Sequence, residues 1–159
     1  MTEQSVFDMS NLSSANRILL VSSLLLIIDS FLPWQHHCVG GLCTGMNAWA
    51  GPAGFLGALM ALSALGMLVF IVAMVLGATS ALGAREVRIA TWLAAGVVGF
   101  GVLRFLVALF NHAALFAWLG LVLVIAIAYG AYMRTQEPAP PQSAPRNRPR
   151  PPEPGDLDS

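Results

Sequence analysis

Residues 52–77, PAGFLGALMALSALGMLVFIVAMVLG, contain no charged residue, and this run decides the class of fold. A helix rises ~1.5 Å per residue, so about 20 residues are needed to cross the ~30 Å apolar core of a bilayer. The run is long enough, and Ser63 is its only polar side chain. It therefore predicts a transmembrane helix.

Three further apolar runs resemble the first in composition. They lie at about residues 17–33, 89–110 and 113–133, and the first of them is marginal in length. The whole chain is 57% apolar and only 10% charged, whereas soluble domains carry about 25% charged residues. We therefore expect an all-α fold, an integral membrane four-helix bundle over residues 17–133.

The two ends of the chain differ from the bundle in composition. Residues 1–16 are polar, and residues 134–159 hold eight of the ten prolines together with several arginines. Such a tail cannot bury an apolar core, so we expect it to be disordered. The sequence predicts a polar N-terminus, a transmembrane domain and a solvated Pro/Arg-rich tail. A weak contact of this tail with a partner protein or with anionic headgroups is the alternative.

Arginines indicate the orientation of the bundle, because cytoplasmic loops carry an excess of positive residues. Arg17 stands at the very start of the first run, Arg85 and Arg88 separate the second from the third, and Arg134 follows the fourth. The segments between the first and second runs and between the third and fourth have no Lys or Arg. We therefore expect both termini in the cytoplasm. The arginine-only, Ala/Gly/Pro-rich composition favours a bacterial source, and hence a bacterial plasma membrane.

Two charged residues lie within the predicted spans, Asp29 and Arg104. Asp29 is about 7 Å before Trp34 and Arg104 about 10 Å before Asn111 along their helices, which places both at a similar depth. Charges within a membrane usually pair or face a water-filled interior. We expect an intramembrane ion pair that fixes how two helices meet; separate snorkelling of the two side chains and a functional polar site are the alternatives.

The predicted outer loop contains Cys38 and Cys43, separated by a segment with two glycines. Two cysteines on an oxidising face indicate a local disulfide that closes a hairpin. A redox-active pair is the alternative, although such enzymes generally use C-x-x-C spacing. His36, His37 and His112 are candidate metal ligands on the same face, but their spacing matches no standard zinc pattern.

No phosphate-binding glycine loop, nucleophile elbow or H-E-x-x-H helix is present, and the net charge is zero. The sequence therefore predicts no enzyme, no cofactor and no nucleic-acid partner. We expect a structural or accessory membrane protein whose partners are the lipid bilayer and a second copy or another membrane protein. Two alternatives remain: a small transporter or channel subunit using Asp29 and Arg104, and a thiol-redox or metal-binding protein of the outer face.

The pattern LLLIIDSFLPWQ at residues 24–35, followed by NAWAG at residues 47–51, resembles a broad set of small four-span membrane proteins from actinobacteria. In those proteins a polar or acidic helix end, Phe-Leu-Pro-Trp and a later Ala-Trp bracket the first outer loop. The resemblance covers about residues 17–60. It implies the four-span architecture and no particular activity.

Overall fold

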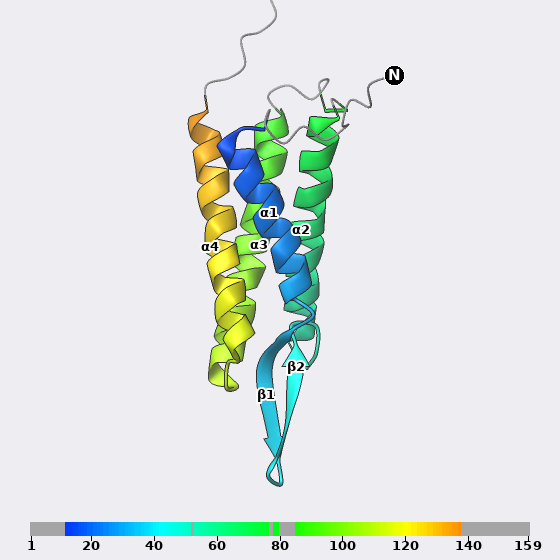
Figure 1. Cartoon of the computed structure of the whole chain (residues 1–159), viewed down its shortest axis with the longest axis vertical. Coiled ribbons are helices and arrows are strands. Elements are labelled where there is room, and N and C mark those ends of the chain that lie inside the picture. The colour runs from blue at the N-terminus through cyan, green and yellow to red at the C-terminus, as the bar shows by residue number, and fades with distance from the viewer. Residues whose placement is uncertain (1–11, 52, 77, 80–84, 138–159) are drawn as a thin grey trace, which may run out of the picture.

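The computed structural model describes residues 12–51, 53–76, 78–79 and 85–137. Within these residues the chain forms four helices and two strands, drawn in Figure 1. In chain order they are α1 (Ser14–Asp29), β1 (Pro33–Val39), β2 (Leu42–Asn47), α2 (Gly54–Val75), α3 (Arg85–Phe110) and α4 (Leu115–Gln136). The predicted tail lies outside the described residues, apart from its first four positions.

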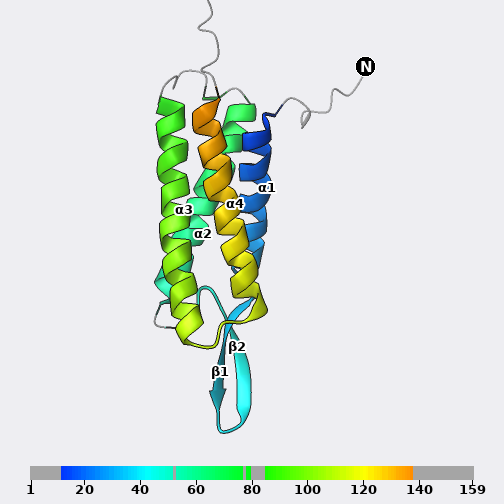
Figure 2. The same ribbon diagram turned by 90° about the vertical axis from the view of Figure 1, so that its left-hand side faces the viewer.

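The four helices form a ring in which each packs against two neighbours. α1 contacts α2 and α4, and α3 contacts the same two helices from the other side. α1 and α3 are therefore diagonal to each other. The described ends of the chain lie together at one end of the bundle, and the two strands project from the other, as Figures 1 and 2 show. We call these the terminal end and the hairpin end.

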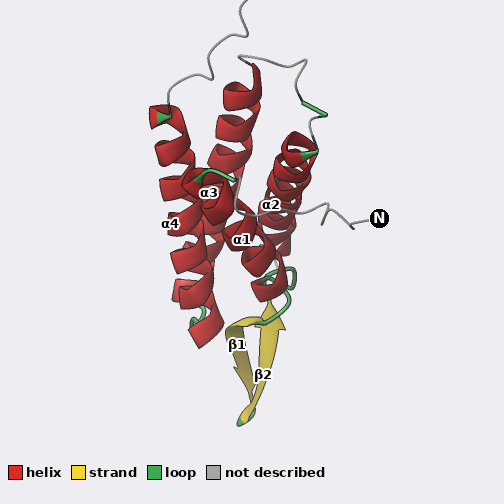
Figure 3. Ribbon diagram, turned by 45° about the horizontal axis from the view of Figure 1, so that its top comes forward, coloured by secondary structure: helices red, strands yellow, loops and turns green. Residues whose placement is uncertain are grey.

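The two strands make the fold mostly helical rather than all-α, which corrects the sequence prediction (Figure 3). β1 and β2 pair antiparallel, with Cys38 opposite Cys43. Gly40 and Gly41 have φ angles of 59° and 84° between the strands. A two-residue hairpin turn of this kind needs positive φ at both positions, which glycine adopts without a steric penalty.

α1 differs from its predicted span at both ends. It begins at Ser14, where Ser13 accepts a hydrogen bond from the backbone N–H of Asn16, and it ends at Asp29. Pro33 disfavours helical conformation at the residue before it, which contributes to this early end. With 16 residues α1 is about 24 Å long, and the helices in the described residues that are long and apolar enough to cross a membrane are α2, α3 and α4.

The outer faces of the long helices are apolar. Phe55, Leu62 and Val69 on α2 and Leu76 just after it recur every seven residues and are all exposed. A helix in a water-soluble bundle would carry polar residues on this face. The core inside the ring is also apolar and includes Leu19, Met67 and Ile127, so α2 carries apolar side chains on its inner and its outer face.

Candidate functional site at the junction of the hairpin and the bundle

Arg104 is the central residue of the hairpin end. It lies on α3, is fully buried, and donates to four oxygen atoms. The acceptors are the backbone carbonyls of Ala48 (2.9 Å from Nε), Asn47 (3.2 Å from Nη2) and Ala50 (3.4 Å from Nη2), and Oε1 of Gln35 (3.3 Å from Nη1). All four belong to the hairpin or to the segment that joins it to α2. A guanidinium suits this role because its five N–H groups spread in a fixed fork.

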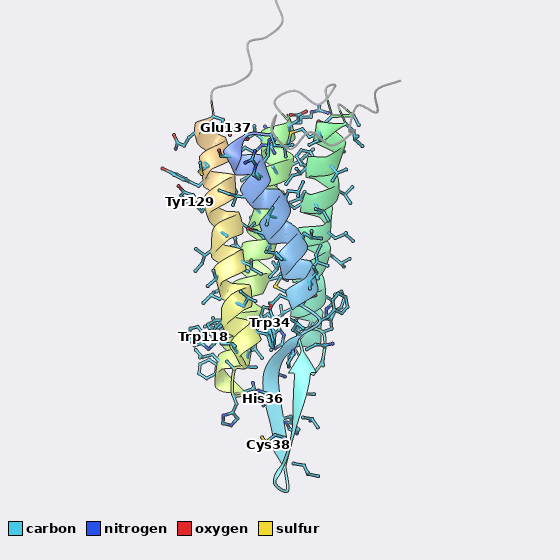
Figure 4. The ribbon with its side chains drawn as sticks, in the orientation of Figure 1. Trp34, His36, Cys38, Trp118, Tyr129 and Glu137 are labelled. Atoms are coloured by element: carbon cyan, nitrogen blue, oxygen red, sulfur yellow. A yellow bond between two sulfur atoms is a disulfide. The ribbon has the colours of Figure 1, made fainter. Side chains whose placement is uncertain are left out.

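Two tryptophans attach the end of α1 to the same junction. Trp34 is fully buried, and its indole N–H donates to the backbone carbonyl of Asp29 at 3.1 Å. Trp49 donates to the hydroxyl of Ser30 at 3.0 Å and stacks on Phe31. Figure 4 shows Trp34 where the strands meet the helices. The hairpin is thus joined to α1 as well as to α3.

Glycines let the junction pack closely on the helices. A Cβ at Gly57 of α2 would overlap the backbone carbonyl of Ala48. A Cβ at Gly120 of α4 would overlap the ring of Trp34 and lie 2.7 Å from Oδ2 of Asp29. All four helices therefore contribute to the surface on which the hairpin is mounted.

The expected ion pair between Asp29 and Arg104 is not formed. Arg104 is bonded to the neutral oxygens described above, and neither carboxyl oxygen of Asp29 has a hydrogen-bond partner. The physical reason is the order of the helices, because α1 and α3 lie diagonally across the ring. Asp29 and Arg104 lie at a similar depth along the bundle. They could pair only if the helices that carry them were neighbours. Asp29 remains only 2% exposed, against Gly120.

The hairpin is closed near its tip by a disulfide between Cys38 and Cys43, as the sequence predicts. Figure 4 shows Cys38 well beyond the ends of the helices. The outer edge of β1 meets the turn between α3 and α4: the backbone N–H of His36 donates to the carbonyl of His112 at 3.2 Å, and Ala114 donates to Trp34 at 2.9 Å. These contacts support the base of the hairpin and leave its tip projecting.

The three histidines line one pocket of about 240 Å³ between β1 and the α3–α4 turn. His112 adopts a left-handed backbone conformation, with φ of 57°, which is uncommon for a residue with a side chain. Within the described residues no three His, Cys, Asp or Glu side chains are arranged to hold a metal ion. Metal binding by His36, His37 and His112 stays an alternative, and the arrangement of the described residues does not favour it.

The terminal end holds a second buried arginine that the sequence interpretation placed outside the bundle. Arg134 lies in the last turn of α4 and donates from Nη1 to Oδ1 of Asn16 at 3.1 Å. Its other terminal nitrogen is 3.0 Å from the sulfur of Met74, and its guanidinium lies over Phe70. Asn16, expected in a polar N-terminal segment, is therefore part of the helix packing.

These features define a multi-helix protein with three helices apolar enough to cross a membrane and a disulfide-closed hairpin fixed to one end. No family model matches the chain, and no curated protein or solved structure is similar to it.

Proposed function

We propose that the chain is a non-enzymatic, structural or accessory protein of the bacterial plasma membrane that presents a rigid hairpin on the outer face. The observation that carries this proposal is the use of Arg104. Within the described residues this fully buried cation donates only to oxygen atoms of the hairpin and of the segment that joins it to α2, and none of these oxygens belongs to a carboxylate. Such an arrangement fixes the position of a surface element and commits the Arg104 guanidinium to that structural role.

The same proposal includes four membrane-spanning helices and a cytoplasmic location for both termini. The apolar outer faces of α2, α3 and α4 support membrane insertion, and the turn after α1, with exposed Phe31, lengthens the apolar segment of the shortest helix. Arg17, Arg85 and Arg88 lie at the terminal end. In the described residues the only arginine near the hairpin is the buried Arg104, so the positive-inside rule favours cytoplasmic termini.

The experiment is photo-cross-linking in cells. A photoreactive residue is introduced at Leu42, which is 78% exposed at the hairpin tip, or at Phe55, which is exposed on the outer face of α2. We expect the probe at Leu42 to give a discrete protein adduct and the probe at Phe55 to label lipid. The Arg104→Gln substitution should remove the Leu42 adduct while the chain remains in the membrane fraction. A Leu42 adduct pattern that is unchanged by Arg104→Gln would contradict the proposal.

One observation favours a second candidate, a small transporter or channel subunit. Asp29 is almost fully buried and its carboxyl oxygens have no partner, and a buried ionisable group within a membrane often marks a path for ions or protons. Flux of ions or solutes through proteoliposomes tests this function. A flux that Asp29→Asn abolishes, in a protein that remains folded and keeps its hairpin adduct, would establish the transporter in place of the structural role.

A further inference from the structure

The chain has three histidines, and all three line the pocket between β1 and the α3–α4 turn. His36 and His37 come from β1 and His112 from the turn, and all three are exposed. Figure 4 shows His36 between Cys38 and the ends of the helices. The volume of about 240 Å³ is below the ~300–1,000 Å³ of sites for drug-sized molecules, so the pocket suits a small ligand.

Backbone hydrogen bonds hold the two walls of this pocket together. The backbone N–H of His36 donates to the carbonyl of His112, and that of Ala114 donates to the carbonyl of Trp34. Residues two apart in a strand direct their backbone groups to the same edge, so the N–H of Cys38 faces the same side as that of His36. Cys38 also lines the pocket. The pocket therefore keeps its shape without contacts between the imidazole rings, which are left to bind a ligand.

A buried positive charge lies directly behind the pocket lining. Gln35 is part of the lining, and its Oε1 accepts a hydrogen bond from Nη1 of Arg104 at 3.3 Å. Within the described residues, every acceptor of this guanidinium is a neutral oxygen. The hydrogen bonds of Arg104 are thus used, but its charge is not neutralised by a bonded carboxylate.

No acidic side chain faces the pocket from the elements around it. Residues 30–51 and 105–115, which include both strands and the α3–α4 turn, contain no Asp, Glu, Lys or Arg. α2 carries no charged residue, and the one charge on α4 is Arg134 at its far end. Asp29, at the end of α1, lies against Gly120 inside the bundle and is not part of the lining. The surroundings of the three histidines therefore favour a negatively charged ligand.

We propose that this pocket binds a phosphate group and that the histidines bind it in their protonated form. Histidine changes its charge between about pH 5 and pH 8, and both ring nitrogens of an imidazolium are donors. Three imidazolium groups repel one another, and an anion between them removes this repulsion. A phosphate offers several oxygens to donors from two segments and makes strong charge-assisted hydrogen bonds. The group belongs either to a lipid headgroup or to a free phosphate.

The spacing of the histidines fits a phosphate better than a metal ion. A zinc ion requires its ligand nitrogens at about 2.0–2.1 Å, and no three described His, Cys, Asp or Glu side chains are arranged in this way. A phosphate is wider, because each of its oxygens accepts from a donor at about 2.7–2.9 Å. It can therefore join His36 and His112 across the pocket.

Isothermal titration calorimetry of the full chain in maltoside micelles, which contain no phosphate, tests the proposal. The probes are inorganic phosphate and sulfate, and sulfate keeps both negative charges over the whole pH range used. We expect sulfate to bind about tenfold more tightly near pH 5.5 than near pH 8, because the imidazolium donors are lost as the pH rises. Absence of binding near pH 5.5, or equal sulfate affinity at the two pH values, would overturn the proposal.

Variants assign the binding to this pocket. His36→Gln and His112→Asn should each lower the affinity for sulfate about tenfold near pH 5.5, and Asn tolerates the left-handed backbone at position 112. Arg88→Gln removes an exposed cation far from the pocket, and Leu42→Gln places an amide at the hairpin tip. Both controls should bind as the parent does, with folding checked by circular dichroism. Equal losses in variants and controls would contradict the site, as would stoichiometric zinc binding that the histidine variants lose.

Nuclear magnetic resonance identifies the source of the phosphate. Three histidines give three sets of imidazole signals, which single variants assign. Signals that move with phosphatidylglycerol at concentrations where inorganic phosphate has no effect indicate a headgroup, and the reverse indicates a free ion. Binding in micelles does not depend on the partner of the hairpin. If sulfate does not bind while the Leu42 adduct forms as expected, the phosphate proposal alone is wrong. If sulfate binds and no adduct forms, the proposed function alone is wrong.

Discussion

Arg104 donates from Nε to the backbone carbonyl of Ala48 at 2.9 Å, a contact that joins α3 to a segment 56 residues earlier in the chain. The same guanidinium holds Asn47 and Ala50, so one side chain fixes the whole connection from β2 to α2. If Arg104 were paired with a carboxylate its charge would be neutralised, but its guanidinium would have fewer N–H groups left for the three carbonyls of Asn47, Ala48 and Ala50. The position of the hairpin therefore depends on one cation more than on its own two-stranded ladder, since an isolated hairpin is marginally stable at best.

Arg104→Gln should destabilise the protein by about 3 kcal/mol or more. The substitution leaves several buried carbonyls without a donor, and each such group costs ~1–3 kcal/mol. Denaturant titration in detergent micelles measures the free energy of unfolding, and limited proteolysis reports on the hairpin. Arg88→Gln, at an exposed position, should change the free energy by less than about 0.5 kcal/mol. Equal stability of the two variants would contradict the role assigned to Arg104.

A double-mutant cycle between Asp29 and Arg104 should give a coupling energy below ~0.5 kcal/mol, because their side chains do not bond to each other. The cycle uses Asp29→Asn, which keeps the side-chain size and removes the negative charge, and Arg104→Gln, which removes the positive charge. Breaking a buried ion pair typically costs ~3–5 kcal/mol. A coupling in that range would restore the ion pair expected from the sequence.

Gly120→Ala should lower the free energy of unfolding by about 1–3 kcal/mol, the usual cost of overpacking a core. The added methyl group overlaps Trp34 and approaches Oδ2 of Asp29, which have no room to move. Gly99→Ala is the matched control on α3, because a Cβ there meets nothing within 4 Å. The control should stabilise the helix by roughly 0.5–1 kcal/mol, and a loss of stability in both variants would show that the junction is not the cause.

The helical part of the fold could be predicted because it depends on local sequence. Run length and hydropathy alone indicate α2, α3 and α4, and the structure places a long apolar helix at each. The residues at which the helices begin and end were less predictable. Because charge usually marks a membrane boundary, the sequence predicts Arg134 in the tail, yet Asn16 and Phe70 provide it with a buried partner and an aromatic surface. Those contacts come from distant parts of the chain.

The site was predicted only in part for the same reason. Depth along a helix follows from residue number, so Asp29 and Arg104 could be placed in one layer, but the order of helices around the ring has no local signal. Gln35 and the carbonyl of Ala48 were missed as partners of Arg104. Backbone carbonyls that accept a hydrogen bond have no signature in the sequence. The one indication that the loop packs against the helices is the presence of Trp34 and Trp49 at its two ends.

Replacing both Cys38 and Cys43 with serine should affect the hairpin more than the helices. A disulfide closing a loop this short constrains the unfolded chain by about 2 kcal/mol in the chain-entropy treatment. We expect faster amide hydrogen exchange in β1 and β2 and a nearly unchanged rate in α2 and α3, because Arg104 still holds the hairpin base. Faster exchange throughout the four helices would show instead that the disulfide supports the entire bundle.

Asn16→Ala should lower the free energy of unfolding by about 1.5–3 kcal/mol, the range for a hydrogen bond to a charged group. Oδ1 of Asn16 accepts from Arg134, and that guanidinium is largely buried between α1, α2 and α4, where water cannot replace the lost acceptor. Asn111→Ala is the control, because Asn111 is exposed and its side chain bonds only to the carbonyl of Val107 on its own helix. The control should cost less than about 0.5 kcal/mol. Denaturant titration of the two variants in the same detergent gives the comparison, and an equal cost would mean that the terminal end of the bundle does not depend on Arg134.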